Sequence, residues 1–516
     1  MLYLAFIFHM HQPYYQNLLT HETPMPWVRL HGTKDYLDMV KILEDYPLIH
    51  QTFNLVPSLI EQIEDYSNGV VKDKFLELSY KNAGELTVQE QNFIRENFFM
   101  INKERVIMIH PRYFELYNKR QADGEFNTQD YLDLQVWFNL SWIDPYFIKT
   151  IPELKKAVMK ARFFTEEEKR ALLDKQTGIL KDIVPGYKKS MESGQIEITI
   201  SPYYHPILPL LCDTRIAREA NHKALLPKTN FKYPGDCKAQ IEEAVEFYRQ
   251  RFGGLAPQGM WPSEEGVSEH IIPFIIQSGI KWIVTDEVIL FRSLKKKVRD
   301  PRLLYQPHLL KRKDGELNII FRDRVLSDLI GFVYYNWKTQ DAVNDLMMHL
   351  ENIADAFKRE DVLAVIAMDG ENAWEYYPGD GHDFLGSLYA RLSESKTVKT
   401  VTVSEYLKER PAKRQIKHLS AGSWIYGEFG KWIGSHYKNK AWECLAKARK
   451  ELDDATGLND EIIKKAFKQI HIAEGSDWFW WYGDDHGYFD GLFRMHLSNF
   501  YKIIDKDIPE YLNDPL

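Results

Sequence analysis

Two segments of the sequence place a carboxylate near an aromatic residue and a turn-forming residue. One reads Trp-Pro-Ser-Glu and ends at Glu264, and the other reads Asp-Gly-Glu and begins at Asp369. Paired carboxyl groups can cleave a glycosidic bond, because one attacks the anomeric carbon while the other, held protonated, gives a proton to the leaving oxygen. The two acids lie far apart in the sequence, so only a fold that brings them together makes this chemistry available.

The two acids differ in how readily a purely structural role explains them. Glu264 and Glu265 follow a proline that could open a helix, and a negative charge in the first turn of a helix complements its dipole. Asp369 instead follows the apolar run 362–366, which is typical of a buried strand, and a core strand needs no carboxylate at its exit. Gly370 then permits a close approach or an unusual backbone angle. Asp369 is therefore the more diagnostic of the two.

Two histidines lie close to the N-terminus, in the run His-Met-His-Gln-Pro. Side chains alternate along a strand, so His9 and His11 are expected on the same side, and Pro13 is expected to end the strand. Such a pair can be metal ligands, partners of sugar hydroxyls or structural residues. A zinc site needs a third ligand and supporting hydrogen bonds, which the sequence does not identify. We therefore predict no metal and no other cofactor.

The elements that must position these residues alternate between strand-like and helix-like segments. Short apolar runs rich in Val, Ile, Phe and Tyr predict strands separated by longer helical stretches. Strands joined by such crossovers are usually parallel, and functional groups on parallel barrels follow the C-terminal ends of the strands. A barrel or a doubly wound sheet is expected. The predicted strands are Tyr3–Phe8, Gln51–Asn54, Ile196–Ile200, Lys281–Thr285, Asn318–Phe321, Leu363–Met368 and Val398–Val403.

A long polar and helical stretch separates the second predicted strand from the third, over about residues 60–190. Within it, Thr165 and Glu168 form a capping box that opens a helix running towards Gly194. An insertion of this length between two barrel strands is expected to overhang the site. The sequence therefore predicts a catalytic barrel domain over residues 1–409 that carries this helical insertion.

The last part of the chain, residues 410–516, is predicted to be a separate helical domain. The strand signals stop near residue 409, and residues 411–414 are the candidate linker. Two amphipathic helices are predicted after it, with Lys and Glu on the outer face. They cover residues 442–453 and 459–473.

The bulk composition argues against several classes of partner. A formal net charge of −8, with no long run of like charge, disfavours nucleic acid and membrane surfaces. The apolar N-terminal run lacks a basic leader, and no apolar run approaches the roughly 20 residues that span a bilayer. Three widely spaced cysteines suggest neither a disulfide framework nor a thiolate metal site, so a cytoplasmic protein is expected. Aromatic residues make up 14% of the chain, which suits sugar binding, core packing or an oligomer interface, and the oligomeric state is not predicted.

Four short motifs, taken together, resemble in order and spacing the signature regions of glycoside hydrolase family 57. The resemblance implies an α/β fold, an incomplete (β/α)7 barrel with helical insertions followed by a C-terminal α-helical domain. It also implies metal-independent retaining chemistry on an α-glucan with α-1,4 or α-1,6 linkages. A later segment, Ser476–His486, resembles the C-terminal helical part of the amylopullulanase-like branch of that family. The four motifs are His9–Pro13, Gly194–Glu197, Trp261–Glu264 and Met368–Glu371.

The resemblance also implies roles for individual residues. The nucleophile of the family falls on Glu264 and its general acid/base on Asp369. A purely structural role stays open for His205, which lies in a proline-containing turn with two tyrosines, and for Trp478, which lies in a run of four aromatic residues. The residues expected to contact or support the substrate are His9, His11, Glu197, His205, Trp261, Glu371, Trp374, Asp477 and Trp478.

The resemblance implies the mechanism more narrowly than the substrate. Amylases, amylopullulanases, 4-α-glucanotransferases, branching enzymes and α-galactosidases share this scaffold, and hydrolases and transferases differ only in whether water or a sugar takes the glycosyl group. Hydrolysis of the amylopullulanase or α-amylase type is favoured by the resemblance of Ser476–His486, and 4-α-glucanotransferase or branching activity is the alternative. Two hypotheses from other classes are a metal-dependent hydrolase that uses His9 and His11, and a non-catalytic glucan-binding relative. The presence of both Glu264 and Asp369 argues against the latter.

Overall fold

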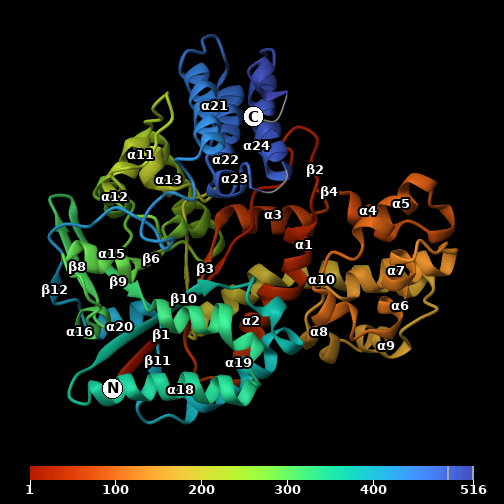
Figure 1. Ribbon diagram of the computed structural model, residues 1–516, viewed down its shortest axis with the longest axis horizontal. Coiled ribbons are helices and arrows are strands. Elements are labelled where there is room, and N and C mark those ends of the chain that lie inside the picture. The colour runs from red at the N-terminus through yellow and green to blue at the C-terminus, as the bar shows by residue number, and fades with distance from the viewer. Residues whose placement is uncertain (485–486, 514–516) are drawn as a thin grey trace.

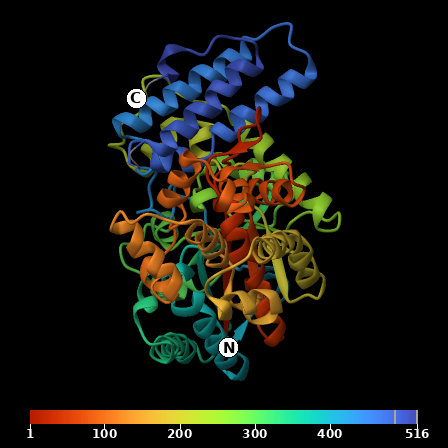
Figure 2. The same ribbon diagram turned by 90° about the vertical axis from the view of Figure 1, so that its right-hand side faces the viewer.

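The computed structural model describes residues 1–484 and 487–513. A strand-bearing body carries the C-terminal helices α21 to α24, residues 436–503, at one end, and the N-terminus lies at the other end (Figures 1 and 2). Helices α4 to α9, residues 74–160, project from one side of this body (Figure 1). The body therefore meets two different groups of helices, and both contribute to the site.

Seven parallel strands in the described part of the chain form the body. They are β1 (Leu2–Met10), β3 (Gln51–Leu55), β5 (Ile196–Thr199), β6 (Gly259–Met260), β7 (Trp282–Asp286), β9 (Gly315–Arg322) and β10 (Val362–Asp369). β1 pairs with β10 and β3, β3 pairs with β5, and β7 pairs with β6 and β9. A parallel bridge between Ile200 and Met260 joins β5 to β6. Between β9 and β10 the contact is irregular, with Asp323 N donating to Val365 O at 2.8 Å, so the barrel of seven units is incomplete as expected.

The seven predicted strands are all present, but one has a different place and one barrel strand was not predicted. The run Val398–Val403 ends early as β11 (Val398–Thr400), because Thr402 caps helix α20 (Val403–Glu409). β11 pairs with the first residues of β1, whereas β3 pairs with the last residues of β1. β11 therefore does not form a barrel unit of its own. The unpredicted strand β6 has two residues, which is too short to show an alternating pattern.

Alternation along the strands explains both the core and the position of the site. Tyr3, Ala5 and Ile7 of β1 belong to the same buried cluster as Leu363, Val365 and Ala367 of β10. The residues between them pack in the larger core between the strands and the covering helices. Because side chains on one face recur every second residue, the next inward positions at the strand ends are His9 and Asp369, which are direct partners in the register. The barrel core thus continues into polar groups at its C-terminal mouth.

The segment between β3 and β5 is almost entirely helical. Its longest helix, α10 (Glu166–Glu192), begins at the predicted capping box, in which Thr165 and Glu168 exchange hydrogen bonds. α10 packs along the barrel side, and the shorter helices extend outward from it (Figure 1). The other helices of this segment are α3 (Pro57–Ser67), α4 (Lys74–Tyr80), α5 (Val88–Asn97), α6 (Pro111–Gln121), α7 (Thr128–Leu140), α8 (Pro145–Thr150) and α9 (Pro152–Lys160).

Further helices cover the remaining crossovers. They are α1 (Trp27–His31), α2 (Leu37–Lys41), α11 (Leu208–Cys212), α12 (Ala217–Ala220), α13 (Pro234–Arg251), α14 (Ile272–Gln277), α15 (Glu287–Ser293), α16 (Pro301–Leu304), α17 (Arg324–Asp328), α18 (Thr339–Ala356) and α19 (His382–Glu394). Strand β8 (His308–Arg312) forms an antiparallel hairpin with β9. The short strands β2 (Glu22–Thr23) and β4 (Lys72–Asp73) pair with each other.

The chain returns to the barrel before it enters the C-terminal helices. Arg414, the last residue of the predicted linker, begins strand β12 (Arg414–Gln415), which pairs with β8. Gly422 then forms a bridge with Val267. The terminal bundle follows, and none of the described helices combines the length and the apolarity that crossing a membrane requires. Its helices are α21 (His436–Asp453), α22 (Asp460–Ala473), α23 (Ser476–Trp481) and α24 (Tyr488–Ile503).

Candidate active site

A cavity of about 590 Å³ opens at the C-terminal mouth of the barrel and brings the two candidate acids together. Its walls come from the strand ends, from the helical insertion, from the returning segment and from the terminal bundle. Residues far apart in the sequence thus share one space. The lining residues are His9, His11, Gln12, Pro13, Tyr15, Trp27, His31, Met100, Ile101, Asn102, Trp142, Glu264, Asp369, Glu371, Asn372, Glu375, Trp424, Asp477, Trp480, Trp481 and Phe489.

Glu264 lies in a single 3₁₀ turn after β6. It does not lie in the first turn of a longer helix, where its charge would have had the purely structural role of complementing the helix dipole. Its backbone is left-handed, with φ of 57°, and the next residue Glu265 has φ of 51°. A non-glycine residue in this region is strained, and such strain is found preferentially where a side chain must be aimed. Glu264 Oε2 accepts a hydrogen bond from Trp424 Nε1 at 2.8 Å, and Oε1 accepts one from Ser476 Oγ at 3.4 Å. The side chain is therefore held from two directions.

Asp369 is the last residue of β10, and its inward direction follows from the alternation of that strand. Its Oδ2 accepts a hydrogen bond from Asn372 Nδ2 at 3.2 Å. Two residues later, Glu371 accepts longer hydrogen bonds from the backbone N of His11 and from the Gln12 side chain. The end of β10 therefore supplies a catalytic candidate, and the loop after it supplies a second buried acid.

Burial raises the pKa values of these acids, because an apolar surrounding disfavours the charged form. The pKa of Glu264 rises to about 8, first by burial and then by repulsion from Asp369 and Asp477, while Trp424 and Ser476 oppose the shift. The pKa of Asp369 also rises by burial, against the effects of Asn372, His11 and Arg322. Burial and repulsion from Asp369 raise the pKa of Glu371 well above its usual range. Because ionised Asp369 raises the pKa of Glu264, the two acids titrate as a coupled pair.

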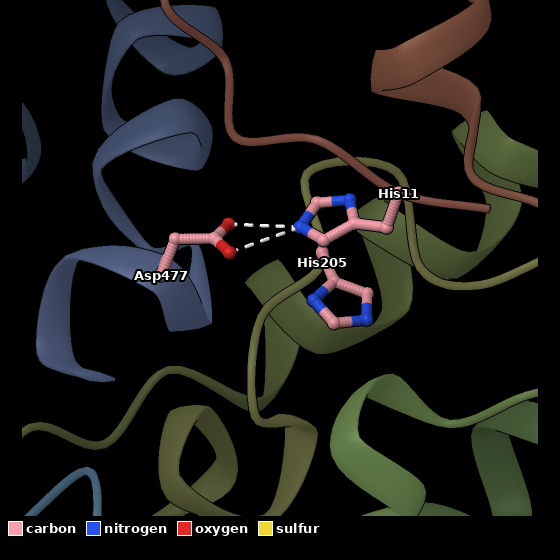
Figure 3. Close-up of side chains that lie close together, drawn as sticks. All are labelled: His11, His205 and Asp477. Carbon is pink, nitrogen blue, oxygen red and sulfur yellow. Dashed lines mark hydrogen bonds and ion pairs between the residues drawn. The ribbon is translucent and has the colours of Figure 1, made fainter. Parts of the chain in front are cut away.

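His9, His11 and Asp477 form the wall beside the acids, and the buried ring of His205 packs behind them. His11 Nε2 bonds to both carboxylate oxygens of Asp477, at 2.9 and 3.1 Å, and His205 lies stacked on His11 with ring centroids 3.9 Å apart (Figure 3). His9 lies next to both rings, and burial lowers its pKa to about 3, so it is neutral. Its Nδ1 bonds to Asn54 Oδ1 at 2.6 Å.

The stacked rings bear on the hypothesis of a metal-dependent hydrolase. His11, His205 and Asp477 have possible ligand atoms within 4.8 Å of one another. A histidine nitrogen binds a metal through a lone pair in the plane of its ring. The rings of His11 and His205 are inclined by only 28° and lie one above the other, so their lone pairs do not converge on one ion in this arrangement. The set fits a hydrogen-bonded wall of a sugar site better than a zinc site.

Comparison with known proteins decides the family. The model for glycosyl hydrolase family 57 matches residues 5–419. This chain belongs to family 57. In a sequence comparison it is 22% identical over 348 residues to Alpha-amylase 1 of Dictyoglomus thermophilum, covering 59% of this chain and 44% of that protein. The chain thus spans less than half the length of this relative.

Solved structures of family 57 share the fold. A branching enzyme from Thermococcus kodakaraensis has a TM-score of 0.64 at 15% identity, covering 97% of this chain and 90% of that one. The α-amylase AmyC from Thermotoga maritima has a TM-score of 0.61 at 15% identity, covering 98% of this chain and 93% of that one. At this identity the likeness shows the fold, including the barrel and its C-terminal helices.

The structure of this family 57 chain brings six of the predicted site residues, including Glu264, to the cavity and keeps others out of its lining. Trp261 is fully buried behind His9, with the two rings stacked at 4.8 Å. His205 is also buried and bonds through Nδ1 to Ser476 Oγ at 2.9 Å. The six are His9, His11, Asp369, Glu371, Asp477 and Glu264 itself.

Three further predicted residues pack away from the cavity. Trp374 Nε1 donates to Gly370 O at 2.8 Å and so braces the loop that follows Asp369. Trp478 Nε1 donates to Ile472 O at 2.7 Å inside the terminal bundle, which agrees with the purely structural role that the sequence left open for it. Glu197 lies near the start of β5, level in the register with Thr52 of β3, and accepts hydrogen bonds from Ser404 Oγ and Trp282 Nε1.

Several residues of the cavity were not predicted from the sequence. Trp424 and Ser476 hold Glu264, yet the first lies in the irregular segment before the bundle and the second was named only as the first residue of the segment Ser476–His486. Trp142 from the insertion carries no motif of its own, whereas Trp480 and Trp481 belong to the run of four aromatic residues within Ser476–His486. The only signal for Trp142 was the richness of the chain in aromatic residues, which does not distinguish a cavity from a core.

Proposed function

We propose that this chain is a retaining α-glucan hydrolase of the α-amylase or amylopullulanase type. The observation that carries the proposal is the meeting of Glu264 and Asp369 in one cavity with aromatic walls. In the proposed mechanism Glu264 is the nucleophile and Asp369 is the general acid/base. The family and the names of its relatives support an α-glucan as the substrate class.

The proposed reaction takes place in two steps. Protonated Asp369 gives its proton to the glycosidic oxygen, while Glu264 attacks the anomeric carbon and the bond to the leaving sugar breaks. Asp369, now ionised, then accepts a proton from water, which attacks the anomeric carbon and releases Glu264. The first step moves one proton from Asp369 to the leaving sugar, and the second step returns one proton from water to Asp369. The enzyme therefore regains its starting protonation state.

The hydrogen bonds of the site favour this distribution of the proton. Glu264 accepts hydrogen bonds from Trp424 and Ser476, and donors of this kind stabilise a carboxylate. Repulsion from ionised Asp369 is one of the main causes of the raised pKa of Glu264. When Asp369 is protonated, this repulsion disappears and the pKa of Glu264 falls. One acid is then ready to attack while the other is ready to donate.

The aromatic side chains of the cavity fall into two groups that suit successive sugar rings. Trp27 and Trp142 pack together at 5.7 Å between ring centroids, close to the insertion. Trp481 and Phe489 stack at 5.6 Å on the side of the bundle. Aromatic faces bind the apolar faces of pyranose rings, so a chain of several glucose units can bind across both groups. We propose α-1,4 linkages, with α-1,6 linkages as a further substrate.

Hydrolysis is proposed ahead of transfer because Ser476–His486 resembles the amylopullulanase-like branch. Asp485 and His486 of this segment lie outside the described residues. Transfer by a 4-α-glucanotransferase or branching enzyme would use the same two acids with a sugar as acceptor. We also propose a cytoplasmic location, in which Cys212 and Cys237 meet as thiols with their Sγ atoms 3.2 Å apart, and we propose no nucleic-acid or membrane partner.

The test is to incubate the wild type with maltoheptaose, soluble starch and pullulan and to separate the products by chromatography. Short reducing sugars are expected from the wild type and are expected to disappear in Glu264→Ala and Asp369→Ala. The matched controls are Glu246→Ala and Asp355→Ala, whose side chains are exposed on helices α13 and α18. Longer or branched products would assign transfer, tight binding without products would assign a non-catalytic protein, and activity in either site variant would refute the mechanism.

A further inference from the structure

A second cluster of ionisable side chains lies where the barrel meets the terminal bundle. Asp236 is in the first turn of α13, His471 is in the last turn of α22, and Glu474 directly follows α22. All three side chains are buried, with at most 3% of each residue exposed. One histidine nitrogen and one oxygen from each acid lie within 4.8 Å of one another. The cluster is distinct from the cavity that contains Glu264.

Two polar atoms of this cluster are buried without a hydrogen-bond partner among the described residues. They are His471 Nε2 and Glu474 Oε1. The other carboxylate oxygen of Glu474 accepts a hydrogen bond from Gln240 Nε2 at 2.8 Å. Buried polar atoms are normally satisfied, because an unmade hydrogen bond in the interior is costly. These two atoms therefore indicate a missing partner at this position.

The charges of the cluster do not cancel. Arg449 binds the carboxylate of Asp236 through Nε at 2.8 Å and through a terminal nitrogen at 3.1 Å, which neutralises this acid. The second nitrogen of His471, Nδ1, lies 3.6 Å from the carboxylate of Glu243 at the surface side. Glu474 lies against the carboxyl group of Asp236, with the amide of Gln240 as a hydrogen-bond donor and the charge of Arg449 nearby. A buried carboxylate in this position must take up a proton or bind a cation.

We propose that Asp236, His471 and Glu474 bind one divalent transition-metal ion, with Zn²⁺ or Mn²⁺ as the chemical class. Imidazole and carboxylate are the ligands that such ions share in proteins. Zinc ligands lie about 2.0–2.2 Å from the ion, so tetrahedral ligand atoms are separated by about 3.3–3.6 Å. The three atoms already lie within 4.8 Å, and small side-chain rotations bring them to this spacing. Water completes the coordination.

The position of this site gives the ion a structural role. Glu474 immediately precedes Gly475 and Ser476, and Ser476 N donates to His205 O at 2.9 Å. The hydroxyl of Ser476 in turn reaches Glu264. An ion bound by α13 and the end of α22 therefore fastens the bundle to the barrel at the start of the segment that enters the catalytic cavity. The ion takes no part in bond cleavage, and the inference stands independently of the proposed function.

The test uses the full chain, stripped of metal with a chelator and then titrated with Zn²⁺ or Mn²⁺. Bound metal is measured by mass spectrometry of the elements, and thermal unfolding gives the melting temperature. One equivalent of metal is expected, with a rise in melting temperature of about 2–5 °C at a hundredfold excess over the dissociation constant. Both effects are expected to disappear in His471→Gln and in Glu474→Gln.

A matched control is His382→Gln, which alters a different buried cluster containing Asp38 and Asp144 and is expected to keep the bound metal. Failure of the stripped wild type to bind metal would overturn the proposal, as would full binding by His471→Gln. Should a variant not fold, the wild type still decides the question, because Co²⁺ bound by nitrogen and oxygen ligands gives visible absorption bands that Zn²⁺ removes. A stripped wild type that shows no such bands would mean that Glu474 holds a proton instead.

Discussion

The substitution Trp424→Phe tests how the site favours the ionised form of Glu264, the proposed nucleophile. The indole Nε1 donates to Glu264 Oε2 at 2.8 Å, and this hydrogen bond opposes the rise in the pKa of Glu264. Phenylalanine keeps an aromatic face in the cavity but has no donor. Removal of the bond is therefore expected to raise the pKa of Glu264 further, while the shape of the cavity changes little.

The size of the shift follows from the strength of a hydrogen bond to a charged group. Such a bond contributes about 1.5–3 kcal/mol, and about 1.4 kcal/mol corresponds to one pKa unit. Because Glu264 is buried, solvent does not screen most of this effect. We expect the pKa of Glu264 in the variant to lie about 1–2 units above that of the wild type.

The assay is the pH dependence of kcat/KM on maltoheptaose, whose acid limb reports the ionisation of the nucleophile in the free enzyme. The acid limb is expected to move to higher pH by about 1–2 units in Trp424→Phe. The control is Trp27→Phe, because Trp27 lines the same cavity and, among the described residues, no hydrogen bond joins it to Glu264 or Asp369. An unchanged acid limb with a uniformly lower rate would refute the reasoning and leave Trp424 only a stacking role.

Three further results are expected. In Glu264→Gln the free energy of unfolding should exceed that of the wild type by about 2–4 kcal/mol at pH 9 but not at pH 4, because burial raises the pKa of Glu264 from 4.5 to about 8, and the wild type loses stability as the pH rises from the first value to the second. Urea unfolding at both pH values measures this, and equal differences would contradict it. Asp369→Asn should lower kcat/KM, which reports the first, acid-assisted step, by about 10²–10⁴-fold on starch but much less on α-glucosyl fluoride, whose leaving group needs no proton, and an equal loss on both substrates would argue against an acid role. Gly422→Ala places a Cβ against Gly427 O and Ile289, so it should lower the free energy of unfolding by about 1–3 kcal/mol and lower kcat by displacing Trp424. Urea unfolding and steady-state kinetics measure these effects, and unchanged values would mean that the segment adapts.

The part of the fold that was predictable is the part in which the pattern is local. The strand that ends at His9 and the strand that ends at Asp369 are long and apolar, and their alternation fixes which residues face inward. The two-residue strand β6 has no such pattern, and its place depends on pairing with β7. The sequence does not indicate the left-handed turn at Glu264 either, because a proline followed shortly by two acids is as compatible with the start of a helix as with this turn.

The candidate site was predictable where motif and strand end coincide, and less so elsewhere. Glu197 belongs to a recognised motif, yet it lies at the start of its strand, and functional groups of parallel barrels follow the other end. Trp424 reaches Glu264 only because the returning segment pairs with β8 and with Val267. Contacts of this kind depend on tertiary structure, so no pattern within the segment indicates them.

The most direct test of the central claim is rescue of the two site variants by azide, with α-glucosyl fluoride as the substrate. In Glu264→Ala, azide should replace the nucleophile and give the β-glucosyl azide by a single inversion. In Asp369→Ala, azide should attack the glycosyl-enzyme and give the α-glucosyl azide with net retention. Nuclear magnetic resonance distinguishes the two products. The same anomer from both variants, or the two anomers exchanged, would contradict the assignment of Glu264 as nucleophile and Asp369 as acid/base.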